Sequence, residues 1–427
     1  MKFAHFSDMH LGFQKSRPLQ GVEQDVFERA LDDCIRRSVD FILVCGDTFH
    51  VNIPEMRVQK FAFAALRRVH EAGIPVYAIY GSHDFSPSAT SVIDLLAETG
   101  YITNVQRLTS NDDGTMSLGF VTDEKTGAKL AGISGLGASK DITYYEKLDR
   151  GPLEAEQGLR IFMFHGAVSE MRTADDAAQA ADAAMPLSYM PRNFDYYAGG
   201  HMHRFRYEPK SFENHPNVVY PGTLFAGFHS DLEENARGAT RGYVLAEFDD
   251  TGITDVRQIG IKNCEYDMIR VNATHKTSHA VSEEIDQRLA GVEPADKVVI
   301  LSVSGRMSEG KTTDVDFAAI SGNLQGRGAV EVKISRRQLS SAEYEITESK
   351  GETAEEIAVN TFGENIGQVD SGAAGLTGRR GAELAKRLLD ILGRPALENE
   401  PLTVYRERVA DEAAAALELD GEGEEQE

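Results

Sequence analysis

Five strand-like apolar stretches in the first half of the chain each run into a short polar segment that contains aspartate or histidine. The stretches span residues 2–6, 41–45, 76–80, 160–164 and, with a weaker pattern, 194–198. Apolar runs of about four to eight residues bounded by turn residues are typical of buried strands. Helical patterns at 22–38 and 54–71 separate the first three stretches. This alternation predicts an α/β fold built on a parallel sheet.

The rest of the chain follows other patterns. Residues 105–150 are rich in turns and are expected to continue the sheet, and strands within 218–248 are expected to close it. Further on, strand-like runs flank two helical pieces, which predicts a small α+β domain. These runs span 268–271, 298–304 and 329–334. After a polar stretch, amphipathic helices are predicted at 381–392 and 402–419.

A chain of 427 residues exceeds one typical domain, so two domains with appendages agree with its length. We expect a large α/β domain at 1–262, a smaller α+β domain at 263–340, a linker at 341–380, a helical segment at 381–419 and an acidic, disordered tail at 420–427.

The formal net charge of −24 argues at first against nucleic-acid binding, because phosphate-binding proteins usually carry a basic excess. Residues 411–427 alone hold eight acidic residues and no basic one, a composition typical of a solvated chain end. A divalent metal pair would also add local positive charge that the formal count omits. The net charge therefore does not exclude a nucleic-acid substrate.

The three cysteines, Cys34, Cys45 and Cys264, lack the spacing of a zinc site or a disulfide framework. We expect buried or idle thiols in a reducing compartment. The first strand begins directly at the N-terminus without an apolar signal segment, and no stretch approaches about 18 unbroken apolar residues. We therefore expect a cytoplasmic, soluble protein with no membrane segment.

The polar segments supply oxygen and imidazole ligands at strand ends. They are Asp8-Met9-His10, Gly46-Asp47, Gly81-Ser82-His83-Asp84, His165-Gly166 and Gly200-His201-Met202-His203. In a parallel sheet the carboxyl ends of the strands meet at one edge, which brings such segments together. Mixed carboxylates and imidazoles suit two divalent ions that share a bridging carboxylate, and Asp47 is the natural bridge.

Each segment alone is weak evidence, because an isolated Asp-x-His, Gly-Asp or His-x-His is common by chance. All five in this order, each at a strand end, argue against coincidence. Five histidines that match none of these segments are interpreted as ordinary surface or core residues, namely His5, His70, His215, His275 and His279.

Together the five segments resemble the motif set of the calcineurin-like metallophosphoesterases. Within that superfamily, residues 6–12 and 46–50 are most similar to the DNA-repair nucleases called SbcD in bacteria and Mre-eleven in archaea and eukaryotes. The resemblance covers about the first 230 residues well, and it continues more faintly at 305–311 and 314–317, which resemble that family's capping domain. It implies a metallophosphoesterase sandwich of sheets flanked by helices, with a smaller α+β capping domain and C-terminal helices.

Matched position by position, the resemblance implies two metal sites. One ion would be held by Asp8, His10, Asp47 and His203. The other would be held by Asp47, Ser82, His165 and His201. The resemblance implies two Mn²⁺ ions, and Mg²⁺ or another divalent ion is an alternative.

The resemblance also implies roles for three residues beside the metals. His83 would protonate the leaving oxygen or contact the phosphate, Asp84 would orient the His83 imidazole, and His50 would lie near the scissile phosphate. One departure is Ser82, where the family usually has asparagine. A serine hydroxyl is a shorter oxygen donor than an amide carbonyl, so we expect a working site whose second ion is held more weakly.

Residues 305–312 satisfy the phosphate-loop pattern G-x-x-x-x-G-K-[ST] after a strand-like run. Glu309 would sit where phosphates need amide donors, and the helix after Thr312 starts poorly. We therefore favour a strand-to-loop turn over a nucleotide site. The second domain carries basic residues that could contact DNA phosphates or could equally form a solvated face. They are Arg306, Lys311, Lys333, Arg336 and Arg337.

The helix predicted at 381–392 carries an apolar face that includes Leu384, Leu388, Leu389 and Leu392. It could fold back on the catalytic domain, or it could dock onto the coiled-coil base of an SMC-like ATPase of the Rad-fifty or SbcC type, as in the family. A homodimer and a location at the prokaryotic nucleoid are further expectations from the resemblance.

The leading functional hypothesis is a manganese-dependent DNA endo- and exonuclease that processes double-strand breaks with the ATPase partner. A first alternative is a metallophosphoesterase of small phosphodiesters. A second is a weakly active scaffold that binds DNA and the ATPase, because Ser82 could impair the site.

Overall fold

The computed structural model describes residues 1–85, 90–173, 184–208, 212–341, 362, 378–395, 397 and 400–417. Most of the predicted linker at 341–380 and all of the predicted tail at 420–427 lie outside the described residues. The chain divides into two compact units, of which the first comprises 1–268, 293–300 and 322–333 and the second 269–292, 301–321 and 334–427. The domain boundaries expected from the sequence stay a prediction.

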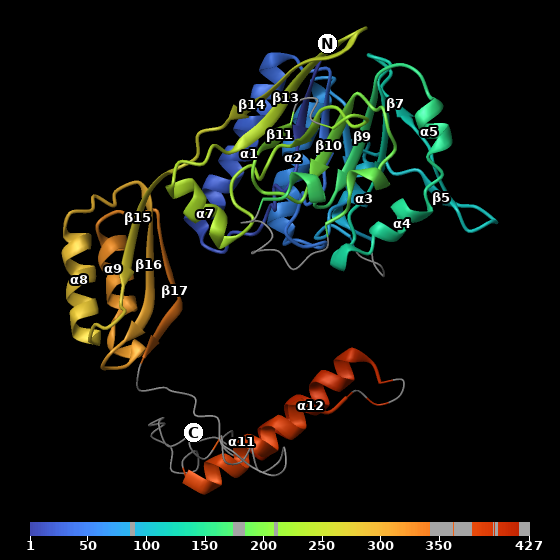
Figure 1. Cartoon of the computed structure of the whole chain (residues 1–427). Coiled ribbons are helices and arrows are strands. Elements are labelled where there is room, and N and C mark those ends of the chain that lie inside the picture. Colours follow the sequence, from blue (N-terminus) through green and yellow to red (C-terminus); the bar gives the residue numbers. More distant parts are fainter. Residues whose placement is uncertain are drawn as a thin grey trace, which may run out of the picture. The chain divides into compact units, whose positions relative to one another are not determined.

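The first unit contains a six-stranded sheet with a parallel centre (Figure 1). In spatial order its strands are β14 (Gly252–Gly260), β13 (Gly242–Asp249), β1 (Lys2–Phe6), β2 (Phe41–Cys45), β3 (Val76–Ile79) and β4 (Thr103–Asn104). Strands β1 to β4 run parallel, whereas β13 and β14 are antiparallel additions beside β1. Helices α1 (Arg17–Arg37) and α2 (Met56–Glu71) connect β1 to β2 and β2 to β3, as the alternating pattern predicted.

A second six-stranded sheet lies in the same unit. Its order is β11 (Arg206–Glu208), β12 (Val218–Tyr220), β10 (Tyr196–Gly200), β9 (Arg160–His165), β8 (Lys129–Ile133) and β7 (Val121–Thr122). The central strands β12, β10, β9 and β8 run parallel, and β11 and β7 are antiparallel edges. Residues 105–150 supply β8, which continues this second sheet by pairing with β9.

Alternating side chains of the central strands pack the two sheets face to face. In β2, Phe41 and Leu43 join a buried cluster with Ile161 and Met163 of β9, whereas the intervening Ile42 belongs to a cluster with α1 and α2. Successive side chains of a strand point to opposite faces, and burial of both faces explains the continuous apolar run. The predicted sandwich of sheets flanked by helices is confirmed.

Short elements complete the first unit. They are the helices α3 (Val92–Glu98), α4 (Ile142–Lys147), α5 (Gly151–Ala155) and α7 (His229–Ala236) and a hairpin of β5 (Leu108–Ser110) and β6 (Met116–Leu118).

A separate three-stranded sheet has the order β15 (Glu265–Asn272), β16 (Lys297–Met307) and β17 (Glu331–Ser341). Helix α8 (Ser278–Ala290) connects β15 to β16, and α9 (Phe317–Gly326) connects β16 to β17, in the order expected of the small α+β domain. Helices α11 (Gly378–Leu392) and α12 (Leu402–Ala416) pack against each other. Among the helices in the described ranges, none is long and apolar enough to cross a membrane.

The phosphate-loop pattern at 305–312 adopts a strand end and a turn. A three-residue 3₁₀ turn, Thr312–Asp314, follows Lys311, and the Lys311 amide donates to the Asp314 carboxylate at 2.6 Å. A phosphate loop needs an α-helix that opens directly after its glycine-rich loop. The structure therefore agrees with the turn that we favoured from the sequence.

Glu23 of α1 holds the loop that follows β1. Its carboxylate accepts hydrogen bonds from the amides of Gly12 at 2.9 Å and Gln14 at 3.4 Å, and the residue is only 3% exposed. Burial raises the pKa of Glu23 to about 7, although the two amides favour the charged form. The hydrogen bonds that hold this loop therefore depend on whether the Glu23 carboxyl group is protonated.

Glu23 should make stability depend on pH. Between pH 4.5 and about 7 the unfolded chain loses the Glu23 proton while the folded chain keeps it, so the free energy of unfolding should fall as pH rises through this window. The expected loss is at most on the order of 3 kcal/mol. Urea unfolding at pH 5 and pH 7.5 should show that the free energy of unfolding falls less in Glu23→Gln than in the parent as pH rises. Glu71→Gln, an exposed control, should follow the parent. An equal loss in Glu23→Gln contradicts this assignment.

Candidate metal centre

The polar segments at the strand ends adopt strained backbone conformations. Asp8, His10, Asp47 and His201 have φ angles of 51°, 45°, 51° and 89°. Positive φ is uncommon for residues other than glycine, and such strain collects at functional sites. Backbone hydrogen bonds hold the first two segments together, because the Asp8 amide donates to the Gly46 carbonyl at 3.0 Å and the His10 amide to the Asp47 carbonyl at 2.9 Å.

Asp47 lies at the centre of the site. One carboxylate oxygen is 3.3 Å from Nε2 of His165 and 3.7 Å from Nε2 of His10. The other oxygen accepts the backbone amide of His83 at 2.8 Å. Burial opposes the ionisation of Asp47, but the neighbouring His165 and His10 bring its pKa below the usual range. A buried carboxylate that faces two imidazoles is placed to bridge two cations.

Asp8, His10 and His203 form a second cluster beside Asp47. Nε2 of His10 lies 3.2 Å from Nε2 of His203, which in turn lies 3.9 Å from a carboxylate oxygen of Asp8. Burial lowers the pKa of His10 well below its usual value, so this ring is neutral. Burial opposes the protonation of His203, but the neighbouring Asp231 raises its pKa. Once both rings are unprotonated, nitrogens that converge in this way can bind one cation together.

The ring nitrogens that point away from the site have fixed partners. Nδ1 of His165 lies 2.8 Å from the Cys45 carbonyl, and Nδ1 of His203 lies 2.8 Å from the Asp231 carboxylate. Burial opposes the ionisation of Asp231, but His203 and Arg241 lower its pKa to about 2. Partners of this kind orient metal-binding histidines and fix their tautomers.

Sequence reasoning missed Asp231. The available signal was its position near the start of a helix, three residues after Phe228, where an acidic side chain commonly caps the backbone. Its carboxylate accepts the amides of Gly227 and Phe228, both at 2.8 Å, in addition to the His203 ring.

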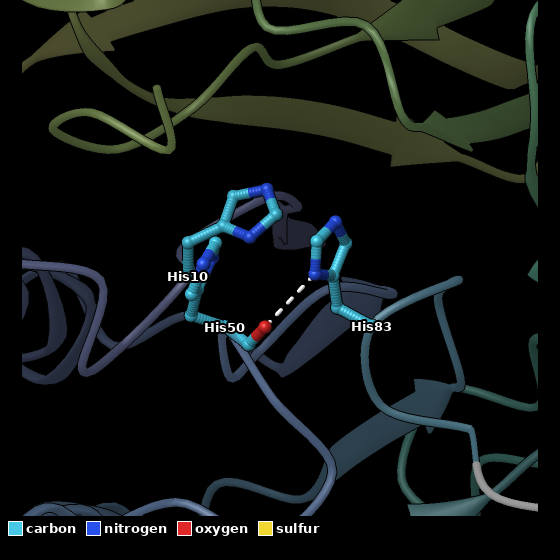
Figure 2. A group of neighbouring side chains, drawn as sticks. All are labelled: His10, His50 and His83. Atoms are coloured by element: carbon cyan, nitrogen blue, oxygen red, sulfur yellow. Dashed lines mark hydrogen bonds between the residues drawn. The ribbon is translucent and has the colours of Figure 1, made fainter. Parts of the chain in front are cut away.

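His50 and His83 lie beside His10 (Figure 2). The ring centroids of His10 and His83 are 4.9 Å apart, and those of His50 and His83 are 5.1 Å apart. Nδ1 of His83 lies 2.8 Å from the backbone carbonyl of His50, which leaves Nε2 for a substrate. The two residues expected near the scissile phosphate are thus next to the two acid–histidine clusters.

The expectation that Asp84 orients the His83 imidazole is wrong. The Asp84 carboxylate accepts backbone amides from Thr48 at 3.1 Å, Phe49 at 3.0 Å and Gly81 at 3.1 Å. These amides take up both of its oxygens, and the His50 carbonyl holds His83 instead. Burial and the nearby Asp47 raise the pKa of Asp84 to about 6. Asp84 therefore ties the end of β2 to the end of β3.

Ser82 and His201 lie at the edge of the same site. The Ser82 hydroxyl is 3.4 Å from the Asp47 carboxylate, and the ring centroids of His201 and His165 are 5.5 Å apart. All three of Ser82, His165 and His201 line one pocket, which Asp141 also borders. The structure thus gathers every residue that the resemblance assigned to the two ions.

The donor atoms fit a pair of divalent cations. Three groups have ligand atoms within 4.8 Å of one another, namely Asp8 with His10 and His203, Asp8 with Asp47 and His165, and His10 with His50 and His83. Buried Nε2 of His165 makes no hydrogen bond in the described part of the chain, although the Asp47 carboxylate lies 3.3 Å away. Buried polar atoms normally have partners, and bound cations would supply one for ring nitrogens directed into the centre.

The predicted DNA-contacting residues belong to β16, β17 and the loop after β16, and the predicted partner-binding residues belong to α11. Arg306 and Arg336 are exposed, Lys311 and Lys333 are half-buried, and the Arg336 guanidinium lies 5.5 Å from the centroid of the Phe317 ring. The side chain of Arg337 lies outside the described part of the structure. On α11, Leu389 and Leu392 are 53% and 61% exposed, whereas Leu384 and Leu388 are half-buried.

Residues 1–205 match the family model described as calcineurin-like phosphoesterase. The matched span includes every acid and histidine of the centre described above except Asp231.

Curated relatives agree with this match. The "DNA double-strand break repair protein Mre11" of Sulfurisphaera tokodaii is 31% identical over 47% of this chain and 49% of its own length. The protein of the same name from Archaeoglobus fulgidus is 27% identical over 52% of this chain and 50% of its own. The "Uncharacterized metallophosphoesterase YhaO" of Bacillus subtilis is 26% identical over 53% of each chain. The match thus spans about half the length of these relatives.

Gly227 offers a test of the centre. A Cβ atom there would lie 2.3 Å from Cδ2 of His10 and 2.6 Å from Cε1 of His203. Gly227→Ala should displace both rings and weaken Mn²⁺ binding by about ten-fold or more, as is usual when metal ligands are misoriented. Isothermal titration calorimetry measures this effect. Gly21→Ala is the matched control, since nothing lies within 4 Å of its added Cβ. Equal Mn²⁺ affinity in the two variants contradicts the ligand assignment.

Proposed function

We propose that the chain, whose residues 1–205 match the calcineurin-like phosphoesterases, is a manganese-dependent nuclease that hydrolyses DNA phosphodiester bonds at double-strand breaks. Metal-dependent phosphoester hydrolysis is the general activity of this family, and DNA cleavage is a specific case of it. The observation that carries the proposal is the convergence of the Asp8 and Asp47 carboxylates with Nε2 of His10, His165 and His203.

When bound, a divalent pair supplies positive charge that holds a phosphodiester and activates the attacking water. We assign Asp8, His10, Asp47 and His203 to one ion, and Asp47, Ser82, His165 and His201 to the other. The shared Asp47 carboxylate fixes the spacing of the two ligand sets. Asp231 and the Cys45 carbonyl keep the rings of His203 and His165 aimed inward.

His83 is the proposed acid. The His50 carbonyl holds its Nδ1, so a doubly protonated ring offers the Nε2 proton to the leaving oxygen. His50, whose ring stacks beside His83, is placed to contact the same phosphate. Asp84 acts indirectly, because it ties together the strand ends that carry Asp47 and His83.

The archaeal relatives are named as DNA double-strand break repair proteins, which supports DNA as the substrate. We also propose that Arg306, Lys311, Lys333, Arg336 and Arg337 contact DNA phosphates. The exposed leucines of α11 would dock onto an SMC-like coiled-coil ATPase of the Rad-fifty or SbcC type. A homodimer at the prokaryotic nucleoid completes this proposal.

A second candidate is hydrolysis of small phosphodiesters. The chain is also similar to a Bacillus subtilis protein that is named only as a metallophosphoesterase, so phosphoester hydrolysis without a DNA substrate is kept as an alternative. A weakly active scaffold is the third possibility, since Ser82 replaces the family's asparagine.

One assay separates the three candidates. The purified protein with Mn²⁺ is tested on single-stranded DNA, hairpin-ended DNA and a generic bis-aryl phosphodiester. DNA cleavage should fall by about 10²- to 10⁴-fold in His83→Ala, because its proton donor is lost. His70→Ala, an exposed histidine outside the centre, is the control and should match the parent. Turnover of the small diester alone favours the second candidate, and DNA binding without turnover favours the scaffold.

Because the parent chain has Ser82 where the family usually has asparagine, its two metal sites should differ in affinity. Titration of the parent with Mn²⁺ should resolve one tight and one weaker site, since the serine hydroxyl reaches less far than an amide carbonyl. Ser82→Asn should tighten the weaker site and leave the other unchanged. Two equally tight sites in the parent would sink this prediction.

A further inference from the structure

Phe228 presents an exposed aromatic ring directly beside the metal centre. The residue is 45% exposed and lies immediately before α7. Its ring stacks on the His203 imidazole with 5.0 Å between centroids and 10° between planes. The ring centroid is also 5.7 Å from that of His10 and 6.3 Å from that of His83. A single exposed aromatic is ordinary on a protein surface, but this one borders the place proposed for the scissile phosphate.

The backbone fixes this ring relative to the centre. The Asp231 carboxylate accepts the amides of Gly227 and Phe228 as well as Nδ1 of His203, each at 2.8 Å. Gly227 has no Cβ, so the chain passes closely over His10 and His203. Phe228 is therefore held in one position by the same carboxylate that orients a proposed metal ligand.

One face of the Phe228 ring is covered and another part stays open. Within the described ranges, His203 is its sole parallel stacking partner, whereas Phe13, His10 and His83 meet the ring at angles of 51° to 74°. Phe13 contacts His50 as well, with 4.8 Å between centroids. An exposed aromatic surface thus adjoins the histidines that would surround the phosphate.

We propose that Phe228 is a stacking platform for the nucleobase next to the scissile phosphate. A nucleobase lies one sugar away from its phosphate, so a phosphodiester at the centre brings a base within reach of a ring at its border. Every base has an aromatic face, so stacking holds a nucleotide without selecting its sequence. Such a contact needs an unpaired base, which favours single-stranded or frayed DNA ends. This inference rests on the proposed nuclease function.

A purely structural role for Phe228 makes a different prediction. If the ring only supports the His203 imidazole, its removal slows cleavage equally whether or not the substrate carries a base at that position. If the ring stacks on the base, removing the ring slows cleavage of a strand that carries the base more than cleavage of a strand that lacks it. The quantity that separates the roles is the ratio of kcat/KM for a strand with the base to kcat/KM for a strand without it.

The experiment uses the full chain with Mn²⁺ and single-stranded oligonucleotides that contain one cleavable linkage. The nucleotide beside that linkage is either normal or abasic. The parent ratio should be about ten, since stacking on an aromatic side chain typically contributes that much per base. In Phe228→Leu the ratio should fall to near one, and in Phe228→Trp, with a larger ring face, it should equal or exceed the parent ratio.

Phe85→Leu is the matched control. Phe85 is 37% exposed, and its ring centroid lies 6.4 Å from that of Tyr80. Because we assign Phe85 no contact with the nucleobase, Phe85→Leu should leave the ratio of kcat/KM values at the parent value. A ratio in Phe228→Leu equal to the parent ratio overturns the stacking role even when DNA is cleaved. If Phe228→Leu does not fold, a ratio in Phe228→Trp below the parent ratio overturns it instead. A parent that cleaves no DNA overturns the proposed function, and the stacking role with it.

Discussion

The buried carboxylate of Asp47 joins the end of one sheet to histidines from both sheets, and the candidate centre depends on this interaction. Asp47 follows β2, whereas His165 ends β9 of the second sheet and His10 follows β1 of the first. An isolated charge is expensive to bury, so this carboxylate must keep partners on both sides. The position of Asp47 therefore constrains how the two sheets meet, and it links the fold to the chemistry.

Glycines near these strand ends permit the close approach that the carboxylate requires. A Cβ at Gly81 would lie 2.1 Å from Oδ1 of Asp47, and a Cβ at Gly200 would lie 1.9 Å from the Cys45 carbonyl oxygen. Both contacts are too short for any side chain, so glycine precedes the polar residues for steric reasons. The motifs Gly-Ser-His-Asp and Gly-His-Met-His thus combine a packing requirement with candidate ligands.

The sequence alone predicted much of the fold and the composition of the centre. Strands β1 and β2 match the expected ranges, because most of their residues are apolar and buried on two faces. The division of the strands between two sheets did not follow from the pattern, since periodicity reports burial but not which strand is the neighbour. The role of Asp84 failed because its partners are backbone amides, which no side-chain pattern reveals. Asp231 was missed because it lies outside the motifs and acts through His203.

In this arrangement the Asp47 carboxylate would bridge a pair of divalent ions. Electron paramagnetic resonance of the manganese-loaded protein tests it most directly, because two Mn²⁺ ions that share a carboxylate are magnetically coupled. We expect the spectrum of a coupled pair in the parent and the spectrum of isolated ions in Asp47→Asn. A parent spectrum of isolated Mn²⁺ at full loading, unchanged in Asp47→Asn, would rule out a bridging role for Asp47.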